Sequence, residues 1–228
     1  MSSTEGAATP VVLFEDAWML AVSKPAGMPV QADPTGDTDL VSWLRTQRKE
    51  LGVDLVHRID RPVSGVVLLS RSTEALPALH AMFRERSMQK HYWAIVEGSV
   101  PMNDPVVLEH SLKHDQRSHR SKVVGASAEA ASRTQVRPLA KGDRYTLVEA
   151  IPEGGAFHQI RSQLGAWGHP IKGDVKYGAR RGEKDRSIAL HARSLRFVHP
   201  FTGEDISISA PCPIGTLWSA LTAAIPMG

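Results

Sequence analysis

The sequence predicts an α+β fold with a mixed, mostly antiparallel central sheet and flanking helices. Short apolar runs of strand type outnumber helical patterns along the chain. Strands and helices are interspersed without the regular strand–helix alternation of a parallel α/β sheet. No internal repeat and no linker rich in Pro, Gly or Ser divides the 228 residues. We therefore expect one continuous domain over residues 11–228, after a small, polar and disordered start over residues 1–10.

The first half of the chain predicts a hairpin, two helices and two more strands. Val11–Phe14 and Trp18–Ser23 are apolar runs separated by acidic residues, which indicates the hairpin, and prolines break the chain after it. Val66–Leu69 and Tyr92–Val96 are strand-like apolar runs. Apolar residues at helical spacing indicate the two helices: Leu40, Trp43, Leu44 and Leu51 after a cap at Thr38 or Asp39, and Leu76, Leu79 and Phe83 after a start near Ser72 or Thr73.

The second half predicts a second hairpin, a short helix, three later strands and a closing helix. Lys113–Lys122 is polar and basic, so we expect a solvated loop there, with a phosphate-contacting edge as the alternative. Gly168 follows the short helix at the position of a C-terminal cap. The expected elements are a hairpin of Arg133–Leu139 and Tyr145–Ile151, a helix with Ile160, Leu164 and Trp167, strands at Ile188–Leu190, Leu195–Val198 and Ile206–Ser209, and a helix from Leu217 to Ile225.

Charge and cysteine content restrict the class of protein. The net charge is +3 and the sequence pI is about 9.1, a mild basic excess that permits a nucleic-acid partner without requiring one. The single cysteine, Cys212, excludes an intrachain disulfide and a thiolate-rich zinc site. No apolar run is long enough to cross a bilayer, so we expect no membrane span and a cytoplasmic protein.

The segment from Val56 to Gly65 is the most informative stretch for chemistry. Asp60 lies between Arg58 and Arg61, and a proline and a Ser-Gly pair that favour a turn follow it. The apolar run after the turn predicts a buried strand that would support the loop. Flanking cations favour an ionised carboxylate that is ready to act as a nucleophile or a base. The alternative interpretation is a surface Asp–Arg pair that only holds the turn together.

Four segments resemble, in the same order, the motifs of RluA-type pseudouridine synthases. His57–Gly65 is similar to the family's His-Arg-Leu-Asp-Arg-x-x-Ser-Gly signature, with Ile59 in place of the leucine. Ser23–Val30 resembles its Lys-Pro-x-Gly-x-x-Val segment, and Lys90–Gly98 resembles its Lys-x-Tyr-x-Ala-x-Val-x-Gly strand. His158–Gly178 resembles its His-Gln-Ile-Arg and Gly-His-Pro-Ile-x-Gly-Asp-x-x-Tyr-Gly run. The resemblance covers about residues 11 to 215, nearly the whole chain.

The resemblance implies an enzyme that isomerises uridine in ribosomal or transfer RNA without a metal or another cofactor. Members of the family break the N1–C1′ bond, turn the uracil and rejoin it through C5. Asp60 matches the catalytic aspartate, which would act as nucleophile or base. Tyr92 matches a tyrosine that stacks on the extruded uracil, and Arg161 matches the arginine that pairs with the aspartate. Arg58 matches an arginine that fills the stack vacated by the flipped base.

Each of these residues also has an ordinary structural interpretation. Tyr92 alternates with Trp93 along a strand, so one of the two faces the core. Arg161 lies beside apolar helix residues, where an arginine that extends to the surface is common. Four further motif residues are expected to contact RNA or support the site, although the histidines could bond backbone and the lysine could be an exposed loop residue: His57, His158, Gln159 and Lys24.

The chain departs from the family pattern just before the His-Gln-Ile-Arg motif. The family's Thr-Gly-Arg-Thr-His is here Gly154-Gly155-Ala156-Phe157-His158, so an arginine and a threonine are missing. This change supports an alternative function, an RNA-binding or RNA-remodelling protein with weak or no catalysis. The single cysteine excludes a zinc deaminase, and a serine hydrolase is poorly supported because no Gly-x-Ser-x-Gly elbow occurs. We expect a monomer without a separate RNA-binding domain in front of the catalytic domain.

Overall fold

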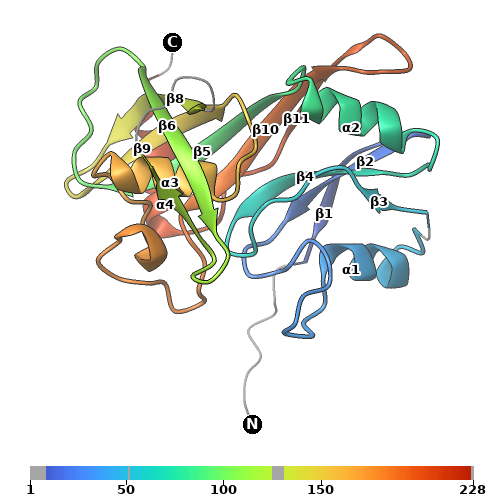
Figure 1. Cartoon of the computed structure of the whole chain (residues 1–228), viewed down its shortest axis with the longest axis horizontal. Coiled ribbons are helices and arrows are strands. Elements are labelled where there is room, and N and C mark those ends of the chain that lie inside the picture. Colours follow the sequence, from blue (N-terminus) through green and yellow to red (C-terminus); the bar gives the residue numbers. More distant parts are fainter. Residues whose placement is uncertain (1–8, 51, 125–130, 227–228) are drawn as a thin grey trace.

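The structure, a computed structural model, describes residues 9–50, 52–124 and 131–226. Eleven strands form one sheet in this part of the chain, and helices flank it (Figure 1). The strands are β1 (Val11–Glu15), β2 (Met19–Lys24), β3 (Asp54–Leu55), β4 (Ser64–Ser70), β5 (Gln89–Glu97), β6 (Val106–Asp115), β7 (Arg120–Val123), β8 (Ala131–Lys141), β9 (Tyr145–Pro152), β10 (Leu190–Val198) and β11 (Asp205–Ser209). The helices are α1 (Leu40–Gln47), α2 (Leu76–Arg84), α3 (Gln159–Ala166), the short 3-10 helix η2 (Val175–Tyr177) and α4 (Thr216–Ala223).

The sheet is mixed but mostly antiparallel, which confirms the predicted fold class. Its strand order is β1-β2-β4-β10-β5-β9-β8-β6-β7, with β3 paired to β4 and β11 paired to β10. The pairing of β10 with β4 is parallel, and every other strand pair in the described residues is antiparallel. The first predicted hairpin corresponds to β1 and β2, and the second to β8 and β9.

Two hydrophobic clusters lie on opposite faces of the central strands. Successive side chains of a strand point to opposite faces, and β2 is completely buried from Met19 to Val22. Met19 and Ala21 pack in one cluster with α2, whereas Leu20 and Val22 pack in the other cluster with α1. The two helices therefore cover opposite faces of the sheet at β2 and β4.

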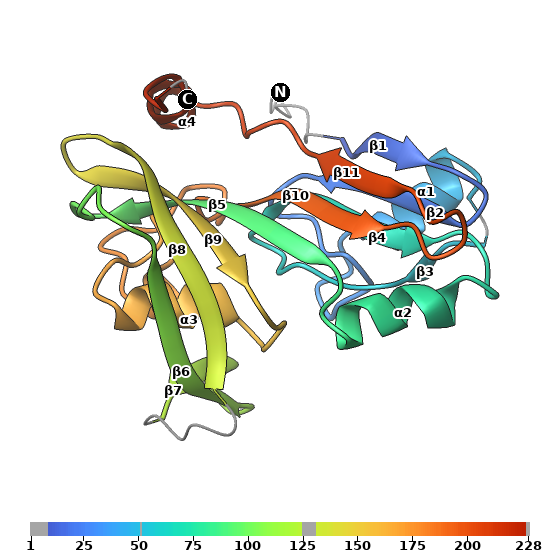
Figure 2. The same cartoon turned by 90° about the horizontal axis from the view of Figure 1, so that it is seen from above.

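The sheet bends beyond β5, and the bend encloses α3. Figure 2 shows β6 and β8 turning away from the direction of β5 and β10, with α3 packed inside the bend. Helix α3 contacts β6, β7, β8 and β9, whereas α2 lies at the other end of the molecule. Helix α4 lies on the outer side of the bend against β8 and β9. The strand β5 thus connects two halves of the molecule that carry different helices.

The predicted solvated loop over Lys113–Lys122 is wrong, because this segment forms most of a hairpin. Leu112 pairs with Val123 and His114 pairs with Ser121, so only a short turn separates β6 from β7. Most side chains of β6 and β7 are polar and at least partly exposed. The segment therefore lacks the alternation of apolar and polar residues by which a strand is predicted from sequence. Backbone pairing of β6 with β8 stabilises the strand instead.

Other boundaries differ from expectation in small ways. Ile188–Leu190 and Leu195–Val198 are not two strands, because one strand, β10, runs from Leu190 to Val198 with a bulge between Ala192 and Ser194. Asp39 caps α1, since its side chain accepts a hydrogen bond of 3.0 Å from the Ser42 N–H. Helix α4 ends before Ile225. The expected disordered start and Leu51 fall mostly or wholly outside the described residues.

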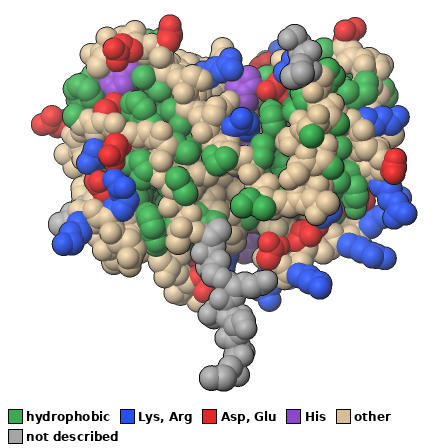
Figure 3. All heavy atoms as spheres, turned by 180° about the vertical axis from the view of Figure 1, so that it is seen from behind, with side chains coloured by type: hydrophobic (Ala, Val, Ile, Leu, Met, Phe, Trp, Pro, Cys, Tyr) green, Lys and Arg blue, Asp and Glu red, His purple; other side chains and the backbone are tan. Residues whose placement is uncertain are grey.

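Figure 3 views the molecule from behind, relative to Figure 1. Figure 3 shows hydrophobic side chains scattered among polar ones on this face, with Lys and Arg gathered mainly toward one edge. Exposed apolar residues include Ile214, just before α4, and Val11 in β1. Within the described residues, no helix combines the length and the apolar character needed to cross a membrane.

Candidate active site

The loop that carries Asp60 is fixed by its neighbours on both sides. A turn follows the aspartate, closed by a 3.0 Å hydrogen bond from the Val63 N–H to the Asp60 carbonyl. Gly65 then has φ of +112°, and a Cβ at this position would lie 2.2 Å from the Ala192 carbonyl oxygen in β10. The Ser64 hydroxyl and His191 Nδ1 are 2.9 Å apart. Only glycine permits this close parallel approach, which anchors the Asp60 loop to the middle of the sheet.

Lys24 supports the same loop from the interior of the protein. This corrects the prediction that it contacts RNA or is exposed in a loop. The residue is completely buried. Its ammonium donates to the carbonyl oxygens of Pro25 and Met28 at 2.8 Å, and to that of Arg61 at 3.3 Å. Burial lowers the pKa of Lys24 to about 7, an effect that the charge of Asp60 opposes. Lys24 therefore joins the Lys-Pro-x-Gly segment to the residue after Asp60 and has no surface for RNA.

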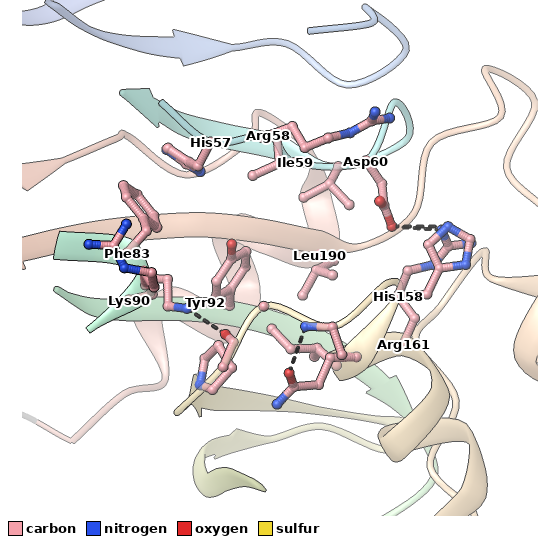
Figure 4. A pocket seen from close by; sticks show the side chains of 18 residues that line it. His57, Arg58, Ile59, Asp60, Phe83, Lys90, Tyr92, His158, Arg161 and Leu190 are labelled. Carbon is pink, nitrogen blue, oxygen red and sulfur yellow. Dashed lines mark hydrogen bonds and ion pairs between the residues drawn. The ribbon is translucent and has the colours of Figure 1, made fainter. Parts of the chain in front are cut away.

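A pocket of about 400 Å³ lies between the end of α2 and the start of α3 (Figure 4). Its size is within the usual range for small-ligand sites. β5 forms one wall, and the Asp60 segment forms another. The lining combines apolar surface with charged groups at its edges: His57, Arg58, Ile59, Asp60, Val63, Phe83, Arg84, Lys90, Tyr92, Pro152, Gly154, Gly155, Ala156, His158, Gln159, Ile160, Arg161 and Leu190.

Asp60 and Arg161 form an ion pair at one end of this pocket. Arg161 Nη1 donates to Asp60 Oδ2 at 2.9 Å, and 24% of the aspartate side chain remains exposed. The rest of the guanidinium binds Asp174, with Nε to Oδ2 at 2.7 Å and Nη2 to Oδ1 at 2.9 Å. Arg161 is 6% exposed and Asp174 is 1% exposed. Burial opposes ionisation of Arg161, but hydrogen bonds and charges from both carboxylates raise its pKa above the ordinary value. A fixed cation thus orients an accessible carboxylate, and Arg161 does not extend to the surface.

His158 approaches the same oxygen of the Asp60 carboxylate as Arg161. Its Nε2 is 3.4 Å from Asp60 Oδ2, and its Nδ1 is 2.8 Å from the Tyr177 hydroxyl. The residue precedes α3 in a left-handed conformation, with φ of +53°. Phe157 stacks on its ring with centroids 3.8 Å apart, and the His114 ring packs against Phe157 in a tilted arrangement at 4.1 Å. Burial lowers the pKa of His158 to about 4, so the imidazole is neutral at pH 7.

Tyr92 faces the pocket, and Trp93 points to the opposite side of β5. In Figure 4 the Tyr92 hydroxyl points across the pocket toward the segment that carries His57, Arg58 and Ile59. Burial, and secondarily the charge of Asp60, raise the pKa of the Tyr92 phenol, which therefore stays protonated at neutral pH. The Trp93 ring instead contacts the guanidinium of Arg193, 5.0 Å from its centroid. Of the two neighbouring aromatic residues, Tyr92 is therefore the one whose ring lies inside the site.

The two residues before Asp60 have different surroundings. Arg58 is exposed at the pocket edge, and it has no hydrogen bond or ion pair with any residue that the structure describes. His57 Nε2 accepts a 2.9 Å hydrogen bond from the Leu68 N–H, and its ring stacks on Phe83. Burial lowers the pKa of His57 to about 3, so its ring is a neutral part of the wall. A cationic contact between His57 and phosphate does not fit this state.

Gln159 is also a buried support rather than an RNA contact, which corrects the prediction. It is 4% exposed. Its Nε2 donates at 3.0 Å to the Arg133 carbonyl and to the Thr134 hydroxyl, and its Oε1 accepts from the Ala156 N–H at 3.1 Å. Because every polar atom of the amide is occupied, the side chain fixes the segment 154–158 against β8. The Lys90 ammonium holds the same segment through the Gly154 carbonyl.

The structure brings the three predicted catalytic residues into one pocket and adds others that sequence reasoning missed. Asp174 and Tyr177 fix Arg161 and His158, and Lys90 and Phe83 complete the lining. Asp174 and Tyr177 lie in the Gly-Asp-x-x-Tyr-Gly run, which was a signal that could have found them. Among the residues that the structure covers, no cluster of three or more His, Cys, Asp or Glu side chains is placed to hold a metal ion.

The sheet and this pocket define the class of the protein as a pseudouridine synthase-like domain, and comparisons with known proteins agree. The family described as RNA pseudouridylate synthase matches residues 19–166. The ribosomal large subunit pseudouridine synthase C of Yersinia pestis is 36% identical over 207 residues, which cover 88% of this chain and 65% of that protein. The tRNA pseudouridine synthase C of Vibrio parahaemolyticus is 33% identical over 231 residues and 92% of each chain.

A solved structure shares the fold at similar coverage. The human RNA pseudouridylate synthase domain containing 1 superposes with a TM-score of 0.78 and 25% identity, over 97% of this chain and 91% of that one. The chain belongs to the RNA pseudouridylate synthase family, whose members are isomerases that act on RNA.

Proposed function

We propose that this protein converts uridine to pseudouridine in ribosomal or transfer RNA, with Asp60, Tyr92 and Arg161 as its catalytic residues. The observation that carries the proposal is the placement of these side chains in one pocket. The accessible Asp60 carboxylate is paired with a buried guanidinium, and the pocket wall beside it carries a tyrosine ring. Membership of the family supplies the reaction, and the pocket supplies the groups that it needs.

The reaction is an isomerisation, so its atoms and electrons balance without a further reactant. The N1–C1′ bond breaks, the uracil turns, and a C5–C1′ bond forms. The proton on C5 is lost, and N1 gains one. Asp60 acts on the nucleoside either as the nucleophile or as the base. In both roles its free oxygen must face the substrate, and Arg161 leaves it free by engaging only Oδ2.

Tyr92 provides a flat surface for the turning base. Its phenol stays protonated at neutral pH, so the ring can stack on uracil while the hydroxyl remains a hydrogen-bond donor. Ile59 and Leu190 line the space around the ring. An apolar enclosure of this kind holds a base without fixing it in one orientation, which suits a uracil that must turn between the two bond-forming steps.

Cationic side chains at the pocket edge are placed to bind RNA. Arg58 is exposed, and it has no protein partner within the described residues, so its guanidinium is available to a phosphate or to a base stack. Arg84 adds a second charge at the end of α2. Extruding a base costs on the order of a few kcal/mol, which stacking of Arg58 in the vacated position would offset.

The substrate is tested by mapping pseudouridine in total RNA from cells with and without this gene. We expect at least one uridine in ribosomal or transfer RNA to lose its modification, and wild-type but not Asp60→Ala protein to restore it. Asp205→Asn, on the exposed strand β11, is the matched control and should restore the site fully. Unchanged maps, together with RNA binding that alters RNA folding, would favour the RNA-remodelling alternative.

We further propose that residues 11–228 form one catalytic domain that works as a monomer in the cytoplasm. The three expected catalytic side chains, Asp60, Tyr92 and Arg161, line one pocket of this chain, which supports a monomer. The names of the relatives refer to ribosomal and transfer RNA, and these substrates are available in the cytoplasm. Light scattering of the purified protein with and without RNA tests the monomer, and a dimer in both states would contradict it.

A further inference from the structure

Tyr177 contacts both side chains that hold the Asp60 carboxylate. Its hydroxyl lies 2.8 Å from His158 Nδ1, and the guanidinium of Arg161 lies over its ring, 5.2 Å from the centroid. The hydroxyl also accepts a 2.7 Å hydrogen bond from the Ser121 N–H in β7. Tyr177 does not line the pocket, so it can act on the reaction only through other residues.

The hydrogen bonds around Tyr177 select one tautomer of His158. The hydroxyl accepts from the Ser121 N–H, and among its partners in the described residues His158 Nδ1 is the one group that can accept the hydroxyl's own proton. A neutral imidazole with Nδ1 as acceptor carries its proton on Nε2. Nε2 is the atom that faces Asp60 Oδ2, at 3.4 Å. A continuous chain of donors therefore runs from β7 through Tyr177 and His158 to the carboxylate.

The opposite tautomer would disturb the site. It would turn a bare nitrogen lone pair toward the Asp60 carboxylate, and the two acceptors would repel each other. The stack of Phe157 on the His158 ring restricts rotation that could relieve this contact. The 3-10 helix η2, which carries Tyr177, is tied to the β6–β7 hairpin a second time, because the Lys176 ammonium donates to the His119 carbonyl at 3.0 Å.

We propose that Tyr177 is a positioning residue that fixes the Nε2-protonated tautomer of His158 and, through it, the orientation of the catalytic carboxylate. The inference deepens the proposed function and rests on it for its kinetic consequence. The tautomer itself is a property of the free protein and is measured without substrate. The tautomer can therefore be tested even if the proposed function is wrong, and the two failures can be told apart.

The kinetic test compares Tyr177→Phe with Tyr145→Phe, which removes the same hydroxyl from a tyrosine at the start of β9, away from the pocket. Under single turnover on a substrate RNA, we expect Tyr177→Phe to lower the rate of pseudouridine formation roughly 3- to 10-fold, the effect of one net hydrogen bond. The Kd for RNA should stay within twofold, and Tyr145→Phe should match wild type. An unchanged rate in Tyr177→Phe would overturn the proposal.

A double variant distinguishes positioning of His158 by Tyr177 from a general contribution of Tyr177 to the fold. In a His158→Ala protein the hydroxyl has no histidine to orient, so adding Tyr177→Phe should not lower the rate further. If the two substitutions instead multiply, Tyr177 acts independently of His158 and the proposal is wrong.

The direct test is the ¹⁵N NMR spectrum of histidine-labelled wild-type protein at pH 7, which distinguishes protonated from bare ring nitrogens. We expect the His158 signals, assigned by their loss in His158→Ala, to show a protonated Nε2 and a bare Nδ1. A protonated Nδ1 would overturn the proposal, even if Tyr177→Phe fails to fold or no RNA substrate is found.

Discussion

Arg161→Met separates the structural role of the guanidinium from its role beside Asp60. Arg161 makes two hydrogen bonds to Asp174 and one to Asp60, and both Arg161 and Asp174 are buried. The substitution keeps a long unbranched side chain but removes the charge. Asp174 is then left as a carboxylate in a site with 1% exposure and without its cation.

The magnitude follows from the cost of breaking a buried ion pair by removing one partner, which is about 3–5 kcal/mol. We expect the free energy of unfolding to fall by this amount at pH 7. For a chain of this size the melting temperature should fall by about 6 to 20 °C. Asp60 also loses a charge-assisted hydrogen bond of about 1.5–3 kcal/mol. If that bond is fully used in the transition state, the single-turnover rate falls roughly 10- to 150-fold.

Urea denaturation followed by tryptophan fluorescence measures the first effect, and pseudouridine formation under single turnover measures the second. Arg161→Met combined with Asp174→Leu replaces the pair by apolar side chains and should recover most of the stability. It should not recover the rate, because Asp60 still lacks its guanidinium. A loss of stability below about 1 kcal/mol in the single variant, or full activity in the double variant, would refute the reasoning.

Three other predictions concern the supports of the site. Gly65→Ala should lower the free energy of unfolding by more than about 2 kcal/mol in urea titrations, because the new methyl group meets the backbone of β10 at positive φ. Lys24→Met should cost about 1–3 kcal/mol by leaving buried carbonyls unpaired, yet filter binding should show an unchanged Kd for RNA. Burial lowers the pKa values of His57, His158 and His191 to about 3, 4 and 4, so below pH 6.5 the unfolded chain binds more protons. Stability should therefore fall as the pH drops from 6.5 toward 4, and less steeply in His57→Gln.

Local patterns were sufficient to predict most elements of the fold. Strand-like apolar runs identified β2 and β4, a hairpin pattern identified β8 and β9, and helical spacing identified α1, α2 and α3. The β6–β7 hairpin was missed because its side chains are mostly polar and its stability comes from backbone pairing with β8. A bulge at Ala192–Ser194 interrupts the alternation of β10, so one strand looked like two.

The candidate site was predicted in its centre but not in its supports. Motif matches identified Asp60, Tyr92 and Arg161, which share the pocket. They could not show whether a polar side chain faces solvent or the interior. Lys24 and Gln159 were expected to contact RNA, yet tertiary packing buries both against backbone carbonyls. That information depends on contacts between segments distant in sequence.

The most direct measurement of the central claim uses purified protein and a substrate RNA found by mapping. Wild type and Asp60→Asn, which keeps the shape of the side chain and removes its charge, are compared for pseudouridine formed per protein and for the Kd of the RNA. We predict that wild type converts the target uridine and that Asp60→Asn forms no detectable pseudouridine while binding the RNA with similar affinity. Pseudouridine formation by Asp60→Asn at the wild-type rate would contradict the account.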